Sequence, residues 1–366
     1  MRVQCGLFVF ILFFARAYAR TAQTSRDFDF TTVTGVETDL RVLARDANAS
    51  DKPKPLLVYL HGYCVDDDAQ QTLELSSNRL VPAVRNRLGI ARRRAQTLVQ
   101  VGLREAALAE NFVYVAPRAP HTTRECVLCP LQEQSPNSQD RLFNSWISGI
   151  LDRDSPQFEC RAWDGSDAVA NPELSAQTDA DVRYVADVID AVKTKFNIGG
   201  DRIYVVGIGT GGFMAARLAC ERPELFRGVV SIAGGTFADP TRCAPKDAKT
   251  NVLFVHGTAD HTVPIDGGEN SHGVAFPSSD ESFRIMGAAM SCANAYVTDT
   301  ESMTLPADSS SLDVGVVKNI FQSCRDDVRV EQWRLQGVDH FFERPTSVKL
   351  FENVVEWLMS RAGTTI

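Results

Sequence analysis

The chain has 366 residues, of which 44% are hydrophobic and 23% are charged, and its formal net charge is −8. This composition is typical of a globular protein with one large α/β domain or two average ones, and it argues against intrinsic disorder. The acidic excess argues against nucleic-acid binding, which usually requires a basic surface.

The first residues have the layout of a cleaved secretory signal. Arg2 precedes an apolar run over residues 7–14, and Ala15, Ala17 and Ala19 follow with the small-residue spacing of a cleavage site. The run is short for a bilayer span, although an uncleaved anchor is the alternative. We therefore expect residues 1–19 to be removed and the protein to be secreted, without membrane contact afterwards.

Two further features agree with export. Asn48 begins an Asn-Ala-Ser sequon and is a candidate glycosylation site. Eight cysteines lie outside the signal, and an even number suggests disulfides in an oxidising compartment, although spacing alone does not assign the pairs. Cys126 and Cys129 form a CxxC, for which a redox motif or half of a zinc site is the alternative interpretation, but no second CxxC accompanies it.

Short apolar runs rich in β-branched residues predict strands buried on both faces, at residues 56–60, 112–115, 203–206, 229–232 and 252–255. Helical patterns occupy residues 181–196, 210–221 and 346–360. This alternation predicts a doubly wound α/β fold with a mostly parallel sheet, in a single domain over residues 20–366. Residues 66–110 and 120–170 are expected to be helical and irregular insertions that shape a cleft at the carboxyl ends of the strands.

The most informative motif is a strand that runs into a tight glycine turn and then a helix. Residues 203–216 read IYVVGIGTGGFMAA, which is similar to the G-x-S-x-G elbow that presents the nucleophilic serine of α/β-hydrolases. Gly207 and Gly211 take the flanking positions, and Gly209 stands where that motif has its serine. A phosphate-binding loop is the alternative, but no lysine follows the turn.

Two later stretches follow in the chain order that this fold requires. Asp260 comes just after a buried strand in VLFVHGTADHTVPIDGG, and His340 follows a strand-like run in GVDHFF. An earlier stretch, LHGYC, could supply backbone N–H groups of Tyr63 or Cys64 to an oxyanion hole together with that of Thr210.

Together these stretches resemble the secreted esterases grouped as poly(3-hydroxybutyrate) depolymerases and feruloyl or acetylxylan esterases. The resemblance runs from about Leu56 to Trp357, with gaps at the two insertions, and is most specific over residues 201–235 and 252–268. It implies the α/β-hydrolase fold and carboxylic ester hydrolysis, with Asp260 as the acid, His340 as the base and Gly209 in place of the nucleophile. It also implies a disulfide between Cys292 and Cys324. We expect no cofactor and no metal, and an ester, a polyester or a feruloylated or acetylated glycan as the ligand.

Three functional hypotheses follow from the glycine at position 209. Loss of the serine from a catalytic triad costs about a million-fold in turnover, so the first is an esterase-family protein with impaired hydrolysis that still binds an ester. The second is an active hydrolase that uses Thr210 or a water activated by His340, although the Thr210 side chain is expected to point into the helix start. The third is a non-catalytic secreted protein that binds carbohydrate, polyester or another partner through its insertions.

The remaining histidines are expected to play other parts. His61 and His256 belong to His-Gly turns and are expected to be structural. We expect His121, His261 and His272 to be solvated loop residues.

Overall fold

The computed structural model describes residues 23–31, 37–45, 52–62, 102–120, 122–123, 160–169, 179–245, 248–270, 273–304, 313–340 and 344–360. The expected signal, Asn48, Tyr63, Cys64 and the 126–129 CxxC lie outside these residues, as do His121, His272 and most of the two insertions.

One large sheet organises the described residues, with strand order β1-β2-β4-β3-β7-β8-β9-β14-β13-β12. Its strands are β1 (Gln23–Thr31), β2 (Glu37–Arg45), β3 (Lys54–Leu60), β4 (Val113–Val115), β7 (Ile198–Ile208), β8 (Gly228–Ile232), β9 (Asn251–Gly257), β12 (Tyr296–Met303), β13 (Val314–Phe321) and β14 (Val330–Leu335). Two small pairs lie apart from it, β5 (Thr122–Thr123) with β6 (Cys160–Arg161), and β10 (Gly268–Glu269) with β11 (Ala275–Phe276).

The centre of the sheet is parallel, and its two edges are antiparallel. Strands β4, β3, β7, β8, β9 and β14 pair in parallel, whereas β1, β2, β12 and β13 join as antiparallel strands. The predicted mostly parallel α/β fold is therefore confirmed, and the five predicted runs fall in β3, β4, β7, β8 and β9. Because the central strands share a direction, their carboxyl ends meet at one edge of the sheet.

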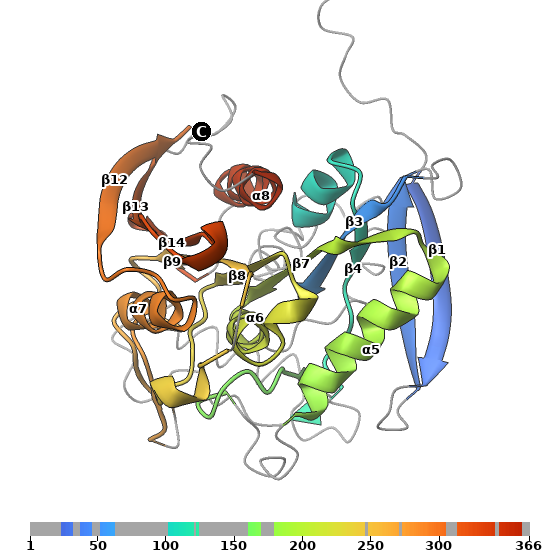
Figure 1. The fold of residues 1–366 in the computed structure, drawn as a ribbon, viewed down its shortest axis with the longest axis horizontal. Helices are drawn as coiled ribbons and strands as arrows, with labels where there is room; N and C mark the ends of the chain where they lie inside the picture. The colour runs from blue at the N-terminus through green and yellow to red at the C-terminus, as the bar shows by residue number, and fades with distance from the viewer. Residues whose placement is uncertain are drawn as a thin grey trace, which may run out of the picture.

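Helices cover both faces of this sheet (Figure 1). Helices α5 (Ala180–Lys195), α6 (Thr210–Glu221) and α7 (Ser279–Ala289) lie on one face, and their buried side chains join the strands in one core cluster. Helix α8 (Arg344–Met359) and a helix over residues 102–109 lie on the other face, where Leu350, Phe351 and Leu103 are fully buried. Three short 3-10 segments complete the described elements, η1 (Pro223–Leu225), η2 (Pro240–Arg242) and η3 (Arg325–Asp327).

The hairpin formed by β12 and β13 extends the sheet beyond β14. A chain of amide and hydroxyl contacts ties it to the parallel strands: Thr298 Oγ1 donates to Asn319 Oδ1, and Asn319 Nδ2 donates to Gln332 Oε1 at 2.7 Å. Gln332 is fully buried, and its amide is satisfied because Oε1 accepts from Asn319 while Nε2 donates to Ser279 and Asp280 in α7. In the part of the chain that the structure describes, no helix is both long and apolar enough to cross a bilayer.

Candidate active site

The glycine turn between β7 and α6 is tightly enclosed. A Cβ atom at Gly207 would lie 1.9 Å from the carbonyl oxygen of Gly211, and one at Gly211 would lie 2.1 Å from that of Leu60. Both positions therefore require glycine for the helix to begin this close to the strand ends. Gly209 lies between them with φ +57° and ψ −120°, a combination that residues with a side chain rarely adopt.

Backbone contacts hold Gly209 at the top of the sheet. Its N–H donates to the carbonyl of Ile232 at the end of β8, and its own carbonyl accepts from Phe213 in the first turn of α6. The turn is thus fixed from the neighbouring strand as well as from the following helix.

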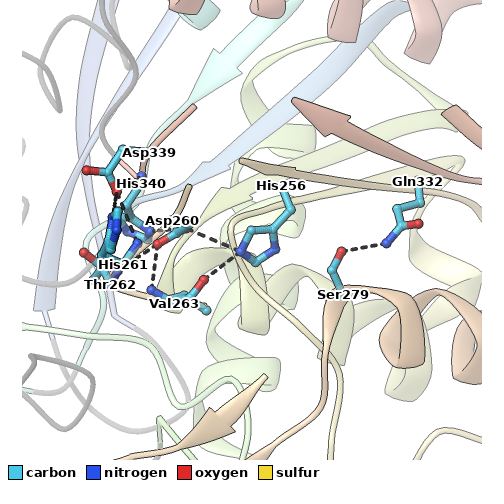
Figure 2. A network of polar contacts seen from close by, with 9 residues as sticks. All are labelled: His256, Asp260, His261, Thr262, Val263, Ser279, Gln332, Asp339 and His340. Carbon is cyan, nitrogen blue, oxygen red and sulfur yellow. Dashed lines mark hydrogen bonds and ion pairs between the residues drawn. The ribbon is translucent and has the colours of Figure 1, made fainter. Parts of the chain in front are cut away.

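Asp260 lies in the turn that follows β9, and its carboxylate is held by donors on both oxygens (Figure 2). Oδ1 accepts the backbone N–H groups of Thr262 and Val263, at 2.9 and 2.8 Å. Oδ2 lies 2.9 Å from Nδ1 of His340 and 3.4 Å from Nε2 of His256. The side chain of Asp260 is fully shielded from solvent.

His340 follows β14, and its ring lies between Asp260 and Gly209. Its Nδ1 is bound to Asp260, and its Nε2 faces the glycine: a Cβ atom built on Gly209 would lie 3.4 Å from Nε2 and 3.6 Å from Cε1 of His340. Three stretches that are widely separated in the sequence therefore converge at the carboxyl ends of β7, β9 and β14.

The electrostatics of the Asp260 and His340 pair favour its charged forms. Burial by itself would raise the pKa of Asp260, but the charge of His340 and the hydrogen bonds from His256 and His340 hold that pKa well below its usual range. Burial would likewise lower the pKa of His340, but the charge and hydrogen bond of Asp260, with a contribution from Asp339, raise it above its usual value. Because Asp260 is then a carboxylate that only accepts, Nδ1 of His340 carries a proton and donates to it.

The turns that carry Asp260 and His340 are bound to each other. The backbone N–H of Ala259 donates to the carbonyl of Val338 at 3.0 Å, and Gly337 N–H donates to Thr258 Oγ1 at 2.9 Å. Asp339 Oδ1 accepts the backbone N–H groups of both His340 and His261, which joins the two turns a second time. The separation of the acid from the histidine is therefore set by backbone contacts as well as by their own hydrogen bond.

Thr210 is the first residue of α6 and is almost completely buried. No hydrogen-bond partner of its Oγ1 is found among the described residues. Of the three residues expected to form an oxyanion hole, only Thr210 is described, and it directly follows Gly209 at the helix start.

The histidines that were expected to be structural differ in their surroundings. His61 Nε2 accepts the backbone N–H of Ala119 at 3.0 Å, and His61 Nδ1 lies 2.7 Å from the carbonyl oxygen of Gly62, so its side chain holds the loop after β3. His256, by contrast, reaches Asp260, which its position in a His-Gly turn did not reveal. The side chain of His261 is 64% exposed, as expected of a loop residue, and lies 3.6 Å from Asp339.

Among the described residues, two cysteine pairs lie at disulfide distance. Cys292 after α7 is bonded to Cys324 at the start of η3, which is the pairing that the resemblance implies. Cys220 at the end of α6 is bonded to Cys243, a pairing that the sequence left open. Both bridges lie within the core face that contains α6 and α7.

Comparisons with known proteins agree with this architecture. The model of the phospholipase/carboxylesterase family matches residues 158–294. NocK of Nocardia uniformis subsp. tsuyamanensis, which its name assigns to the esterases, is 38% identical over 101 residues, 27% of this chain and 29% of that protein. This chain has the α/β-hydrolase fold and is similar to esterases over part of its length.

Further relatives match shorter stretches of this α/β-hydrolase. A protein of Aspergillus terreus named "Probable feruloyl esterase C" is 33% identical over 81 residues, 22% of this chain and 29% of that protein. Poly(3-hydroxyalkanoate) depolymerase C of Paucimonas lemoignei is 35% identical over 60 residues, 16% of this chain and 14% of that protein. The matches thus span less than a third of the length of these relatives. The acetyl xylan esterase of Aspergillus awamori superposes with a TM-score of 0.46 at 11% identity, over 90% of this chain and 98% of that one.

Proposed function

We propose that this α/β-hydrolase binds a carboxylic ester at the Gly209 turn and hydrolyses it poorly, because glycine replaces the nucleophilic serine. In this proposal Asp260 is the acid that orients His340, and His340 is the base. The observation that supports this proposal most directly is the distance of 3.4 Å between Nε2 of His340 and the position that a Cβ atom of residue 209 would occupy. A serine there would be within reach of the base, whereas glycine offers no oxygen.

The start of α6 gives the ester a place for its carbonyl oxygen. Backbone N–H groups in the first turn of a helix have no partner within the helix, and the helix dipole favours negative charge there. The backbone N–H of Thr210 would therefore donate to the carbonyl oxygen of the ester. The backbone N–H of Tyr63 or Cys64, which follow β3 in the sequence, would be the second donor. The ligand class is an ester, a polyester or a feruloylated or acetylated glycan, by likeness to relatives named as feruloyl esterase and polyhydroxyalkanoate depolymerase.

The test compares hydrolysis of a chromogenic ester by the native protein with that by Gly209→Ser. We expect native turnover close to that of His340→Ala, and no labelling of residue 209 in the native protein by a serine-directed phosphonate. Native turnover that is high and is lost in His340→Ala would refute impaired hydrolysis.

A second candidate function is direct hydrolysis by a water molecule that His340 activates. It is favoured by the buried hydrogen bond between Asp260 and His340, which keeps the ring oriented for proton transfer even without a serine. It predicts slow native turnover that is lost in His340→Ala and leaves no acyl group on the protein. Thr210 as a nucleophile has less support, because it lies one residue past Gly209, which faces His340. Labelling of Thr210 by the phosphonate would support Thr210 as the nucleophile.

We also propose that the protein is exported as one domain over residues 20–366 after removal of residues 1–19. The support is the two disulfides, which persist in oxidising compartments and are rare in the cytosol. Amino-terminal sequencing of the mature protein tests this, and a glycosidase-sensitive mass at Asn48 tests the expected glycan. A non-catalytic binding role for the insertions is separated from ester binding by a glycan or polyester pull-down that survives His340→Ala.

A further inference from the structure

His256 is the next-to-last residue of β9, and its side chain reaches across the turn that carries Asp260. Its Nε2 lies 2.8 Å from the carbonyl oxygen of Val263 and 3.4 Å from Oδ2 of Asp260 (Figure 2). A carbonyl oxygen can only accept, so Nε2 carries the proton and donates it, chiefly to Val263 and more weakly to Asp260.

Through these two contacts His256 acts on both oxygens of the carboxylate. It contacts Oδ2 directly. It also anchors Val263, whose own N–H donates to Oδ1 at 2.8 Å. The side chains of His256 and Asp260 are 3% and 0% exposed, so water does not replace these contacts if they are lost. A buried carboxylate that loses a donor pays a desolvation cost and changes its orientation or its charge.

We propose that His256 is a positioning residue that fixes the orientation of Asp260 and, through Asp260, aligns His340 on position 209. The catalytic meaning of this alignment depends on the proposed function, whereas the alignment itself does not. Four ionisable side chains on the described elements surround the contact: Asp260 and His340 form the pair, and Asp339 and His261 lie on the outer side of the two turns.

The competing explanation is that His256 only fills space at a His-Gly turn. The two explanations differ in what a substitution must supply. A positioning role needs a donor at the place of Nε2, so His256→Gln, whose amide nitrogen extends about as far, should preserve it, whereas His256→Leu should not. A packing role needs only volume and predicts the opposite order or no difference.

The first experiment titrates the imidazole of His340 by NMR in the otherwise native protein. We expect its measured pKa to fall toward the ordinary value in His256→Leu, because a loosened Asp260 attracts the imidazolium less, and to stay near the native value in His256→Gln. Leu253→Ala is the matched control, since Leu253 is fully buried on the same strand and faces the other core cluster. An unchanged pKa in folded His256→Leu, or an equal fall in Leu253→Ala, would overturn the proposal.

If His256→Leu does not fold, His256→Asn takes its place, because its amide is too short to reach Val263 and Asp260. It should lower the pKa of His340 where His256→Gln does not, and equal values in these two amide variants would overturn the proposal.

The second experiment measures ester hydrolysis in the Gly209→Ser background. Displacing a catalytic group by about 1 Å costs on the order of 100-fold in rate, so His256→Leu should lower kcat by roughly 10- to 100-fold with little change in KM. A rise in KM at constant kcat would contradict positioning. If Gly209→Ser itself is inactive, the proposed function fails, and the NMR titration still decides the role of His256.

Discussion

Introducing a hydroxyl group at position 209 should turn this site into a working serine esterase if the proposed roles of Asp260 and His340 hold. A Cβ there would lie 3.4 Å from Nε2 of His340, which is an ordinary contact, and its next nearest neighbours are Cε1 of His340 at 3.6 Å and Cα of Gly62 at 3.8 Å. A serine therefore fits without moving the dyad, and its Oγ can reach the roughly 2.6–3.2 Å of a hydrogen bond to Nε2. Removing the serine of a triad costs about 10⁶-fold in kcat, so the gain in Gly209→Ser should be on the order of 10³- to 10⁶-fold.

The same substitution should destabilise the protein. With φ +57° and ψ −120° the residue is held where a side chain costs roughly 1–3 kcal/mol, and urea unfolding should show a loss of this size in the free energy of unfolding. Gly209→Ala is the control, because it carries the same backbone strain without an oxygen. Hydrolysis of a p-nitrophenyl ester and labelling by a serine-directed phosphonate report the gain. Folded Gly209→Ser that hydrolyses the ester no faster than Gly209→Ala would refute the reasoning.

Three other predictions concern the framework of the site. Gly211→Ala should lower the free energy of unfolding by about 1–3 kcal/mol or more in a urea titration, because its Cβ would lie 2.1 Å from the carbonyl oxygen of Leu60; a loss below about 1 kcal/mol would contradict the close approach. The raised pKa of His340 means that its protonation stabilises the fold below about pH 6.5 and that this contribution is lost as the pH rises through the raised pKa. The stability difference between the native protein and His340→Gln should therefore shrink from about pH 6 toward pH 9, and a difference that grows would reverse the assigned direction. Replacing Cys292 and Cys324 by alanine opens a bridge across 32 residues and should cost about 4 kcal/mol, seen as a lower Tm than that of the native protein; an unchanged Tm would contradict the bridge.

The central strands could be predicted because their sequences carry an unambiguous signal. Runs such as residues 56–60 and 252–255 are short and apolar without alternation, which favours a strand covered on both faces. The hairpin of β12 and β13 gave no such signal. Strand β12 reads YVTDTESM, and all but its last residue are exposed, so a polar edge strand could not be told from a loop. Its place in the sheet is decided by its pairing with β13, which follows in the sequence after residues that the structure does not describe.

The candidate site was likewise predictable only in part from the sequence. Gly209, Asp260 and His340 could be proposed from short motifs in the right order, and the structure brings all three together. The part played by His256 could not be proposed, because a His-Gly pair after a strand also occurs at His61, where the imidazole contacts the backbone of Gly62 and Ala119. The contact of His256 with Val263 depends on the path of the chain after β9, which the local sequence does not predict.

The Asp260 and His340 pair supports our proposal that this site has a function. Burying an ion pair usually brings little net stability, and apolar residues of similar volume at such positions are often neutral or stabilising by about 1–4 kcal/mol. Here the carboxylate receives donors from two backbone N–H groups and two imidazoles, and the ring that it orients faces a residue with no side chain to receive a proton from. Stability alone does not require this arrangement, because well-packed apolar residues could replace it. A site that presents an oriented imidazole to a bound ester or to water does need it, and this supports our proposal that the protein acts at Gly209.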